Sequence, residues 1–345
     1  NIVFTVDLGE INGTGSGIGA NNVGIAVAKA SSVTALGTGS IVFNGTGGGA
    51  GGFAGSNDGV RIDSLSQFNA VDGDITISGT GGATGGKGIS LLTQAKLIVT
   101  GAGNISLTGT GGSLGNNNVG ISMSTGTVRV ATGDITITGT GGNAAGLNSG
   151  VYLYASTIEQ TGAGGGTIQI VGHGNGTGSS NHGVVIDYLT KVTALGSGSI
   201  QMTGAATTRA GALSNNVGLV VMRSSQVTAV NGDIDLTGTG ATSATGTGNR
   251  GVVVHQSLIR NSTGSGNISI TGRAGTGTHY NDGVLIYYKS IVASGGLLSV
   301  TGTGGGVGSY NQGVYVSSST TTSVAGTVFS GTGGGVTGNL NHGVY

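Results

Sequence analysis

The chain has 345 residues, 78 of them glycine and none of them cysteine or proline, and 12 basic residues balance 12 acidic ones to a formal net charge of +0. A balanced charge removes the electrostatic attraction that binding to nucleic acid or to an anionic membrane surface requires, so neither partner is expected. No apolar run is long enough to span a bilayer, so direct membrane insertion is not expected. The lack of cysteine excludes disulfides and thiolate sites.

The chain repeats one unit eleven times. In each unit, a short alternation of apolar and polar residues ends at a glycine, and successive glycines lie 29 to 34 residues apart. A fixed period of this size is typical of stacked repeat proteins rather than of globular domains. These glycines are Gly13, Gly45, Gly79, Gly109, Gly139, Gly172, Gly204, Gly238, Gly272, Gly302 and Gly331.

Each unit contains the same elements in the same order. The first is an alternating segment such as 133–142, which reads GDITITGTGG and is followed by a variable loop rich in Gly, Ser and Thr. A second alternation comes next, such as 150–153, and a third and weaker one follows eight or nine residues after its glycine. Alternation with period two predicts half-buried strands. The third strands are centred on Val33, Phe68, Leu97, Val128, Ile158, Val192, Val227, Ile259 and Ile291.

Three short strands and three turns form one closed coil, and the fold predicted is an all-β, right-handed parallel β-helix (β-solenoid). It has about eleven coils of 29–34 residues, which stack into a rod roughly 50 Å long at about 4.8 Å per coil. The right-handed sense follows from the usual hand of parallel crossover connections. We expect residues 1–345 to form a single continuous solenoid without end caps, as a segment of a longer repeat protein.

Asparagine forms the clearest column of polar side chains. It stands two residues before the second-strand glycine in every unit but the third, which has Gly86. Asn tolerates the left-handed backbone conformation, and its amide can bond both the backbone and a stacked identical amide. The pattern predicts an asparagine ladder at one corner; a ligand-binding row of amides is the alternative. The ladder consists of Asn22, Asn57, Asn118, Asn148, Asn181, Asn216, Asn249, Asn281, Asn311 and Asn341.

No catalytic, cofactor-binding or metal site is predicted. The five histidines lack metal-ligand spacing, and Asp74 and Asp233 stand at a corner where other units have Asn, Ser or Thr, which favours turn bonding over a calcium loop. The alternative class is a β-helical polysaccharide-binding or polysaccharide-degrading protein. A degrading enzyme of this fold needs clustered carboxylates, whereas Glu10 and Glu159 are the only glutamates and most aspartates lie in separate units. The chain is therefore not expected to be an enzyme.

The segment GDITITGTGG followed by Asn-x-Gly-Val-x-Leu, over essentially the whole chain, resembles the Gly- and Thr-rich β-strand repeats of large bacterial surface adhesins of the filamentous-haemagglutinin and autotransporter-passenger type. This resemblance implies an extracellular or cell-surface protein of a prokaryote that holds a cell, sheath or biofilm together. The function expected from it is a structural or adhesive rod. Its expected partners are other copies of itself or other cell-surface components, with carbohydrate as a further candidate.

The second strand also predicts an interface. If the residue after its glycine points inward, the next one points outward, and the outward column becomes apolar or aromatic in the last seven units. An exposed stripe of this kind usually marks an interface, unless the variable loop folds over it and makes a second core. We call this column the stripe; it consists of Tyr152, Val185, Val220, Val253, Leu285, Tyr315 and Tyr345.

A threonine column on the first strand raises ice binding as a less favoured function. Regular outward Thr arrays can match an ice lattice, but the adjacent column changes from Thr and Ser to Gln169, Gln201 and Asp235. A solvated column retained for its β propensity is preferred. The column consists of Thr108, Thr138, Thr203, Thr237, Thr271 and Thr301.

Overall fold

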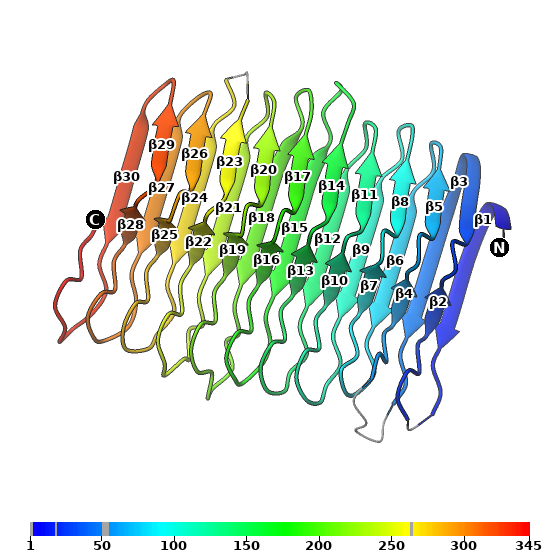
Figure 1. The fold of residues 1–345 in the computed structure, drawn as a ribbon, viewed down its shortest axis with the longest axis horizontal. Helices are drawn as coiled ribbons and strands as arrows, with labels where there is room; N and C mark the ends of the chain where they lie inside the picture. Colours follow the sequence, from blue (N-terminus) through cyan, green and yellow to red (C-terminus); the bar gives the residue numbers. More distant parts are fainter. Residues whose placement is uncertain (1–2, 18, 50–54, 263–264) are drawn as a thin grey trace.

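The computed structural model describes residues 3–17, 19–49, 55–262 and 265–345. In this part of the chain, 30 parallel strands wind as a right-handed β-helix, and the N- and C-termini lie at opposite ends of the rod (Figure 1). Every coil crosses three faces. The described residues form no helix long and apolar enough to cross a membrane.

The first face carries the strands that end at the repeated glycines, and all eleven glycines pair in register from Gly13 to Gly331. Its strands are the C-terminal halves of β1 (Val3–Thr14) and β3 (Ser32–Thr46), with β6 (Ile75–Thr80), β9 (Ile105–Thr110), β12 (Ile135–Thr140), β15 (Thr167–His173), β18 (Ser199–Ala205), β21 (Ile234–Thr239), β24 (Ile268–Arg273), β27 (Leu298–Thr303) and β30 (Thr327–Thr332).

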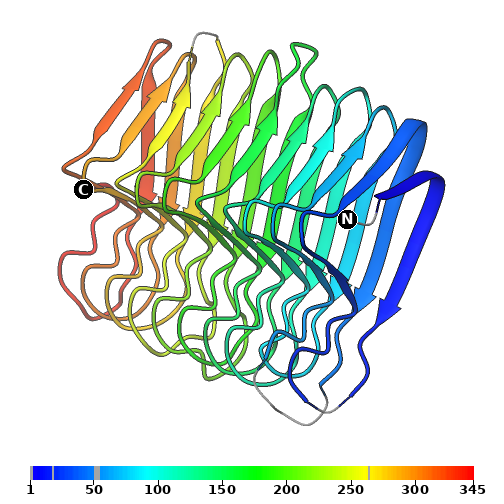
Figure 2. The ribbon, with the colours of Figure 1, turned by 45° about the vertical axis from the view of Figure 1, so that its right-hand side comes forward.

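The second face is a separate ten-stranded sheet. Its strands are β2 (Ile25–Val27), β4 (Val60–Ile62), β7 (Ile89–Leu92), β10 (Ile121–Ser124), β13 (Val151–Tyr154), β16 (Val184–Asp187), β19 (Leu219–Met222), β22 (Val252–His255), β25 (Val284–Tyr287) and β28 (Val314–Ser317). Long loops connect the first face to this sheet, and they stack along one edge of the rod (Figure 2).

The third face begins with the N-terminal halves of β1 and β3, whose length joins it to the first face in one sheet. Its other strands are β5 (Gln67–Ala70), β8 (Lys96–Val99), β11 (Thr127–Val130), β14 (Thr157–Gln160), β17 (Lys191–Ala194), β20 (Gln226–Ala229), β23 (Leu258–Asn261), β26 (Ile291–Ser294) and β29 (Thr320–Ser323). One predicted centre is wrong by one residue: Val292, not Ile291, continues the buried column from Ile259, and Ile291 is exposed.

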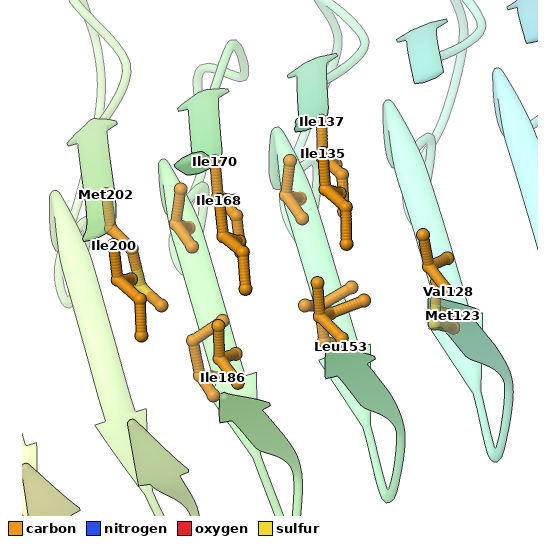
Figure 3. Packing of buried hydrophobic residues seen from close by; sticks show 14 of the residues in the cluster. Met123, Val128, Ile135, Ile137, Leu153, Ile168, Ile170, Ile186, Ile200 and Met202 are labelled. Carbon is orange, nitrogen blue, oxygen red and sulfur yellow. The ribbon is translucent and has the colours of Figure 1, made fainter. Parts of the chain in front are cut away.

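The core is a continuous column of aliphatic side chains inside the coils. Ile135, Ile168 and Ile200 stack on the inner side of the first face, opposite Leu153 and Ile186 from the second face (Figure 3). All five are fully buried. A coil alone cannot bury its core side chains on both sides, so each coil depends on its neighbours for stability.

The asparagine ladder is present at the corner before the second face, and each rung follows one rule. Where two ladder asparagines stand in adjacent coils, the backbone N–H of the first donates to Oδ1 of the second, as in Asn148 to Asn181 at 3.0 Å and Asn181 to Asn216 at 2.8 Å. The ladder breaks at Gly86, and the Oδ1 of Asn118 in the following coil is buried without a hydrogen-bond partner. The amide column thus bonds backbone along the rod, as the sequence predicts for a structural ladder.

The reason given for asparagine at this corner needs a correction. The residue with positive φ is the one before the ladder asparagine, for example Leu147 at 61°, Ser180 at 59° and Tyr280 at 58°. The ladder asparagines described have ordinary negative φ. Asn is therefore required here by its hydrogen bonds, and its tolerance of the left-handed conformation plays no part.

The other two corners carry polar ladders as well. At the corner between the third-face and first-face strands, Asn104 N–H donates to Asp74 Oδ1 at 2.7 Å and Asn267 N–H donates to Asp233 Oδ1 at 2.7 Å, so these aspartates bond the backbone of the next coil rather than a turn of their own. After the second face, buried hydroxyls bond the carbonyls of the preceding strand; Ser225 donates to Met222 at 2.7 Å. This hydroxyl ladder was missed, because a Ser or Thr at intervals of about thirty residues does not stand out in a chain so rich in both.

Candidate functional site

The second face concentrates the aromatic side chains of the molecule. The chain has nine tyrosines, and each lies on an outward position of the second-face strands or at a corner that borders them. The outward positions of the other two faces are mainly threonine, serine and other polar residues. We call this side of the rod the tyrosine face; its tyrosines are Tyr152, Tyr154, Tyr188, Tyr280, Tyr287, Tyr288, Tyr310, Tyr315 and Tyr345.

The stripe lies on this face in the predicted register, from Tyr152 opposite Val185 to Leu285 opposite Tyr315. Its two ends differ from its middle. Val185, Val220, Val253 and Leu285 are at most 7% exposed, whereas Tyr345 is 62% exposed. The four aliphatic residues are therefore not a bare surface.

A small second core accounts for this burial. Val217, from the loop that precedes β19, clusters with Val220, Val253 and Leu285, and Tyr287 and Tyr315 pack against them while remaining half-buried. Of the two alternatives for the stripe, the second core covered by the loop is therefore the correct one for its middle residues. What remains accessible on the tyrosine face is aromatic and polar, together with leucines at its corners such as Leu147, Leu189 and Leu340.

The central part of this face holds a buried carboxylate. Asp187 is fully buried and forms a two-pronged ion pair with the guanidinium of Arg223, from the adjacent coil. The Tyr152 hydroxyl donates to Asp187 Oδ2 at 2.8 Å. Burial, reinforced by this carboxylate, raises the pKa of Tyr152 to about 12. All three polar groups satisfy one another, so the cluster fixes this part of the face.

A second charged pair lies toward the C-terminus. Arg250 Nε donates to Asp282 Oδ2 at 2.9 Å, and Asp282 Oδ1 accepts the Gln312 N–H at 3.1 Å. Burial raises the pKa of Asp282 above its ordinary value, and Arg250 partly offsets the rise. The pair sits at the bottom of a hollow of about 390 Å³. We call this the C-terminal hollow; its lining includes Arg250, Tyr280, Asp282, Tyr310, Gln312 and Tyr315.

Two stacked pairs of aromatic rings lie at the C-terminal hollow or beside it. Tyr280 and Tyr310, which both line the hollow, have ring centroids 5.0 Å apart and nearly parallel planes, at 12°. His255, outside the lining, stacks on Tyr287 at 4.5 Å at the C-terminal ends of β22 and β25. Both pairs come from corresponding positions in successive coils, so the coil spacing itself produces ring stacking.

His182 follows the ladder residue Asn181 at the corner before the second face. Its Nδ1 accepts the backbone N–H of Val217 at 3.2 Å, a bond that requires the neutral ring. Desolvation of this half-buried ring lowers the pKa of His182 to about 4. The histidine is therefore neutral at physiological pH and helps to hold the loop before β19.

The arrangement does not favour hydrolytic chemistry. The buried acidic residues of the described chain are Asp58, Asp187 and Asp282, and the nearest two, Asp187 and Asp282, are separated by three coils, or about 14 Å at the strand spacing. Catalytic carboxylate pairs of glycosidases lie roughly 5 to 9.5 Å apart. Among the described residues, no group of three His, Asp or Glu side chains could hold a metal ion.

Comparison with known proteins gave no match: no family model fits the chain, and no curated protein or solved structure is significantly similar to it.

Proposed function

We propose that this chain is a structural and adhesive segment of an extracellular bacterial fibre or large surface adhesin. The observation that carries the proposal is the unbroken register of the eleven glycines along the rod. Each coil is hydrogen-bonded to its neighbours on three faces, so bending the rod would disrupt several ladders at once. Such a scaffold suits a protein that carries load or holds a binding surface at a distance.

The placement of the tyrosines supports an adhesive role in addition to a mechanical one. Tyrosine offers a large contact area with a polar tip and loses little conformational freedom on binding, which is why it is enriched at interfaces. Because tyrosine is restricted to one face, the rod has one side suited to adhesion and two sides that lack tyrosine. The resemblance to surface adhesin repeats agrees with this division. Self-association through this face or through the ends of the rod is part of the proposal.

The proposal can be tested with the purified chain coupled to micrometre beads. We expect the beads to attach to one another or to bacterial cell surfaces under flow, and Tyr280→Ser with Tyr310→Ser to reduce attachment. Thr237→Ser with Thr271→Ser, on the first face, is the matched control and should leave attachment unchanged. Beads that never attach, or that attach equally well with both double variants, would contradict an adhesive tyrosine face.

A polysaccharide-degrading enzyme is the competing function, and it is less favoured because the buried carboxylates are widely separated and two of them are paired with arginine. Release of reducing sugar from a panel of pectin, alginate and glycosaminoglycan would establish it instead.

A further inference from the structure

We propose that the C-terminal hollow binds a neutral polysaccharide, with a sugar ring stacked on Tyr280 and its hydroxyl groups hydrogen-bonded by Arg250 and Asp282. This inference rests on the proposed adhesive function in one respect: it assigns the adhesive contact of the rod to this hollow. Four features of the hollow point to this ligand class: an open aromatic platform, a polar pair that is electrically balanced, its size, and its direction along the rod.

The platform is the ring of Tyr280. Tyr310 stacks on one side of it at 5.0 Å, and the corresponding residue in the coil on the other side is Gly248, which has no ring to stack there; the amide of Asn215, from the coil beyond, is the side chain that reaches this glycine. Tyr280 is 48% exposed. An aromatic ring already held in place by its neighbour can receive a flat apolar ligand surface with little loss of side-chain entropy. The apolar side of a pyranose ring is such a surface.

The polar groups lie beside this platform. A Cβ placed on Gly248 would lie 2.5 Å from Asn215 Oδ1 and 3.5 Å from Arg250 Nη1, so the Asn215 amide and the Arg250 guanidinium both border the gap that this glycine leaves. Arg250 uses Nε to bind Asp282, and among the residues that the structure describes its two Nη groups make no hydrogen bond. Hydroxyl groups both donate and accept, so they can bond the guanidinium and the carboxylate together.

Charge and size favour a small neutral ligand. Because Arg250 is already paired with Asp282, the hollow offers no net positive charge to a phosphate or a carboxylate-rich polymer. A volume of about 390 Å³ fits a ligand of a few sugar units.

The direction of the hollow matches an extended chain. Its tyrosines come from successive coils, Tyr280 and Tyr287 from one and Tyr310 and Tyr315 from the next. Positions that repeat at the strand spacing of about 4.8 Å suit a ligand that is itself extended and periodic. A polysaccharide lying along the rod meets equivalent groups at each step.

The test uses the full chain and affinity electrophoresis in gels that contain dextran, hydroxyethyl cellulose or xyloglucan, with alginate and heparin as acidic probes. We expect retardation by at least one neutral polymer and by neither acidic one. Gly248→Asn should weaken the affinity about tenfold, because its side chain displaces the Asn215 amide and occupies the space against Tyr280, while Asn tolerates the φ of 71° at this position. Tyr280→Ala should weaken it similarly.

Gly211→Asn is the matched control, since Gly211 has a φ of 85° and nothing near its Cβ position. This control should bind normally, and all three variants should unfold cooperatively near the wild-type temperature. Failure of every neutral polymer to bind, or stronger binding of alginate or heparin, would overturn the ligand class. If bead attachment still depended on the tyrosines, the adhesive function would survive that result. A monomer–oligomer equilibrium abolished by Tyr280→Ala would instead identify a second copy of the chain as the occupant, against the proposal.

Discussion

At the scale of single residues, stability depends on polar side chains that satisfy backbone groups of the next coil. The ladder asparagines from Asn57 onward are almost all fully buried, and all but Asn118 supply an Oδ1 acceptor to the backbone N–H of the preceding ladder asparagine, as Asn216 and Asn249 do. Buried N–H groups without a partner cost about 1–3 kcal/mol each. The amide ladder is therefore as necessary to the corner as the aliphatic core is to the interior.

Replacing Asn181 and Asn216 together with Leu should lower the free energy of unfolding by about 2–5 kcal/mol, because two buried backbone donors lose their acceptors. The measurement is urea unfolding followed by circular dichroism. Ser180→Asn is the control, since position 180 is the one with positive φ and Asn accepts that conformation. Unfolding midpoints that are the same for the double variant and for wild type would count against a structural ladder.

The burial of His182 predicts a specific pH dependence. Its pKa is about 4 in the folded chain and 6.5 in the unfolded one. Between these values the unfolded chain binds a proton that the folded chain does not, so this contribution to stability is present above pH 6.5 and is lost as the pH falls toward 4. His182→Gln should flatten that part of the profile of unfolding free energy against pH. His173→Gln, at an exposed position of the first face, should leave it intact.

At the scale of elements, the loop 81–88 is the irregular one. It is shorter than its successor, 111–120, and it places Gly86 where a Cβ would lie 2.5 Å from Gly82 N and 2.6 Å from Asn57 O. Asparagine is therefore absent from this coil for a steric reason. The unpartnered Oδ1 of Asn118 is the consequence in the neighbouring coil.

Two measurements follow from this break in the ladder. Amide hydrogen exchange should be faster at residues 81–88 than at residues 141–150, where the ladder is complete. Gly86→Asn should destabilise the chain by about 1–3 kcal/mol despite restoring the consensus residue. Gly164→Asn is the control, because its Cβ position meets only Thr132 Cγ2, at 3.7 Å. An increase in stability with Gly86→Asn would show that the loop can open to admit the side chain.

At the scale of the whole molecule, the coils are interchangeable units held by nearest-neighbour contacts. Deletion of residues 110–139 removes one full coil and joins Gly109 to Thr140, the residue that pairs with Thr110. We expect this variant to fold. Its m-value in urea should be smaller by about a tenth, because one coil fewer contributes surface that becomes exposed on unfolding. Deletion of residues 110–124 removes one loop between the first and second faces and one second-face strand, so the third-face strand of that coil no longer meets its partners. This variant should not fold cooperatively. Equal behaviour of the two deletions would contradict the coil as the folding unit.

Much of the fold could be predicted from the sequence, because its determinants are local and repeated. Period-two alternation assigns the strands, and eleven repetitions fix the register of every glycine and of the stripe. The error at Ile291 shows the limit of this reasoning. Ile291 and Val292 are both β-branched, and only pairing with Leu258 and Ile259 decides which one points inward.

The candidate site could not be predicted in the same way. Tyr152, Tyr315 and Tyr345 stand at the predicted stripe position, but the other six tyrosines stand at a second strand position and at the two corners that border the second face, which the strand pattern does not single out. Parallel stacking brings these positions to one side of the rod and places Gly248 beside Tyr280.

The sequence by itself determined the coil, since alternation and turn residues act within a few positions of the chain. The tertiary structure alone decided which side chains from different coils share a surface, because contact between coils depends on the stacking of residues about thirty positions apart.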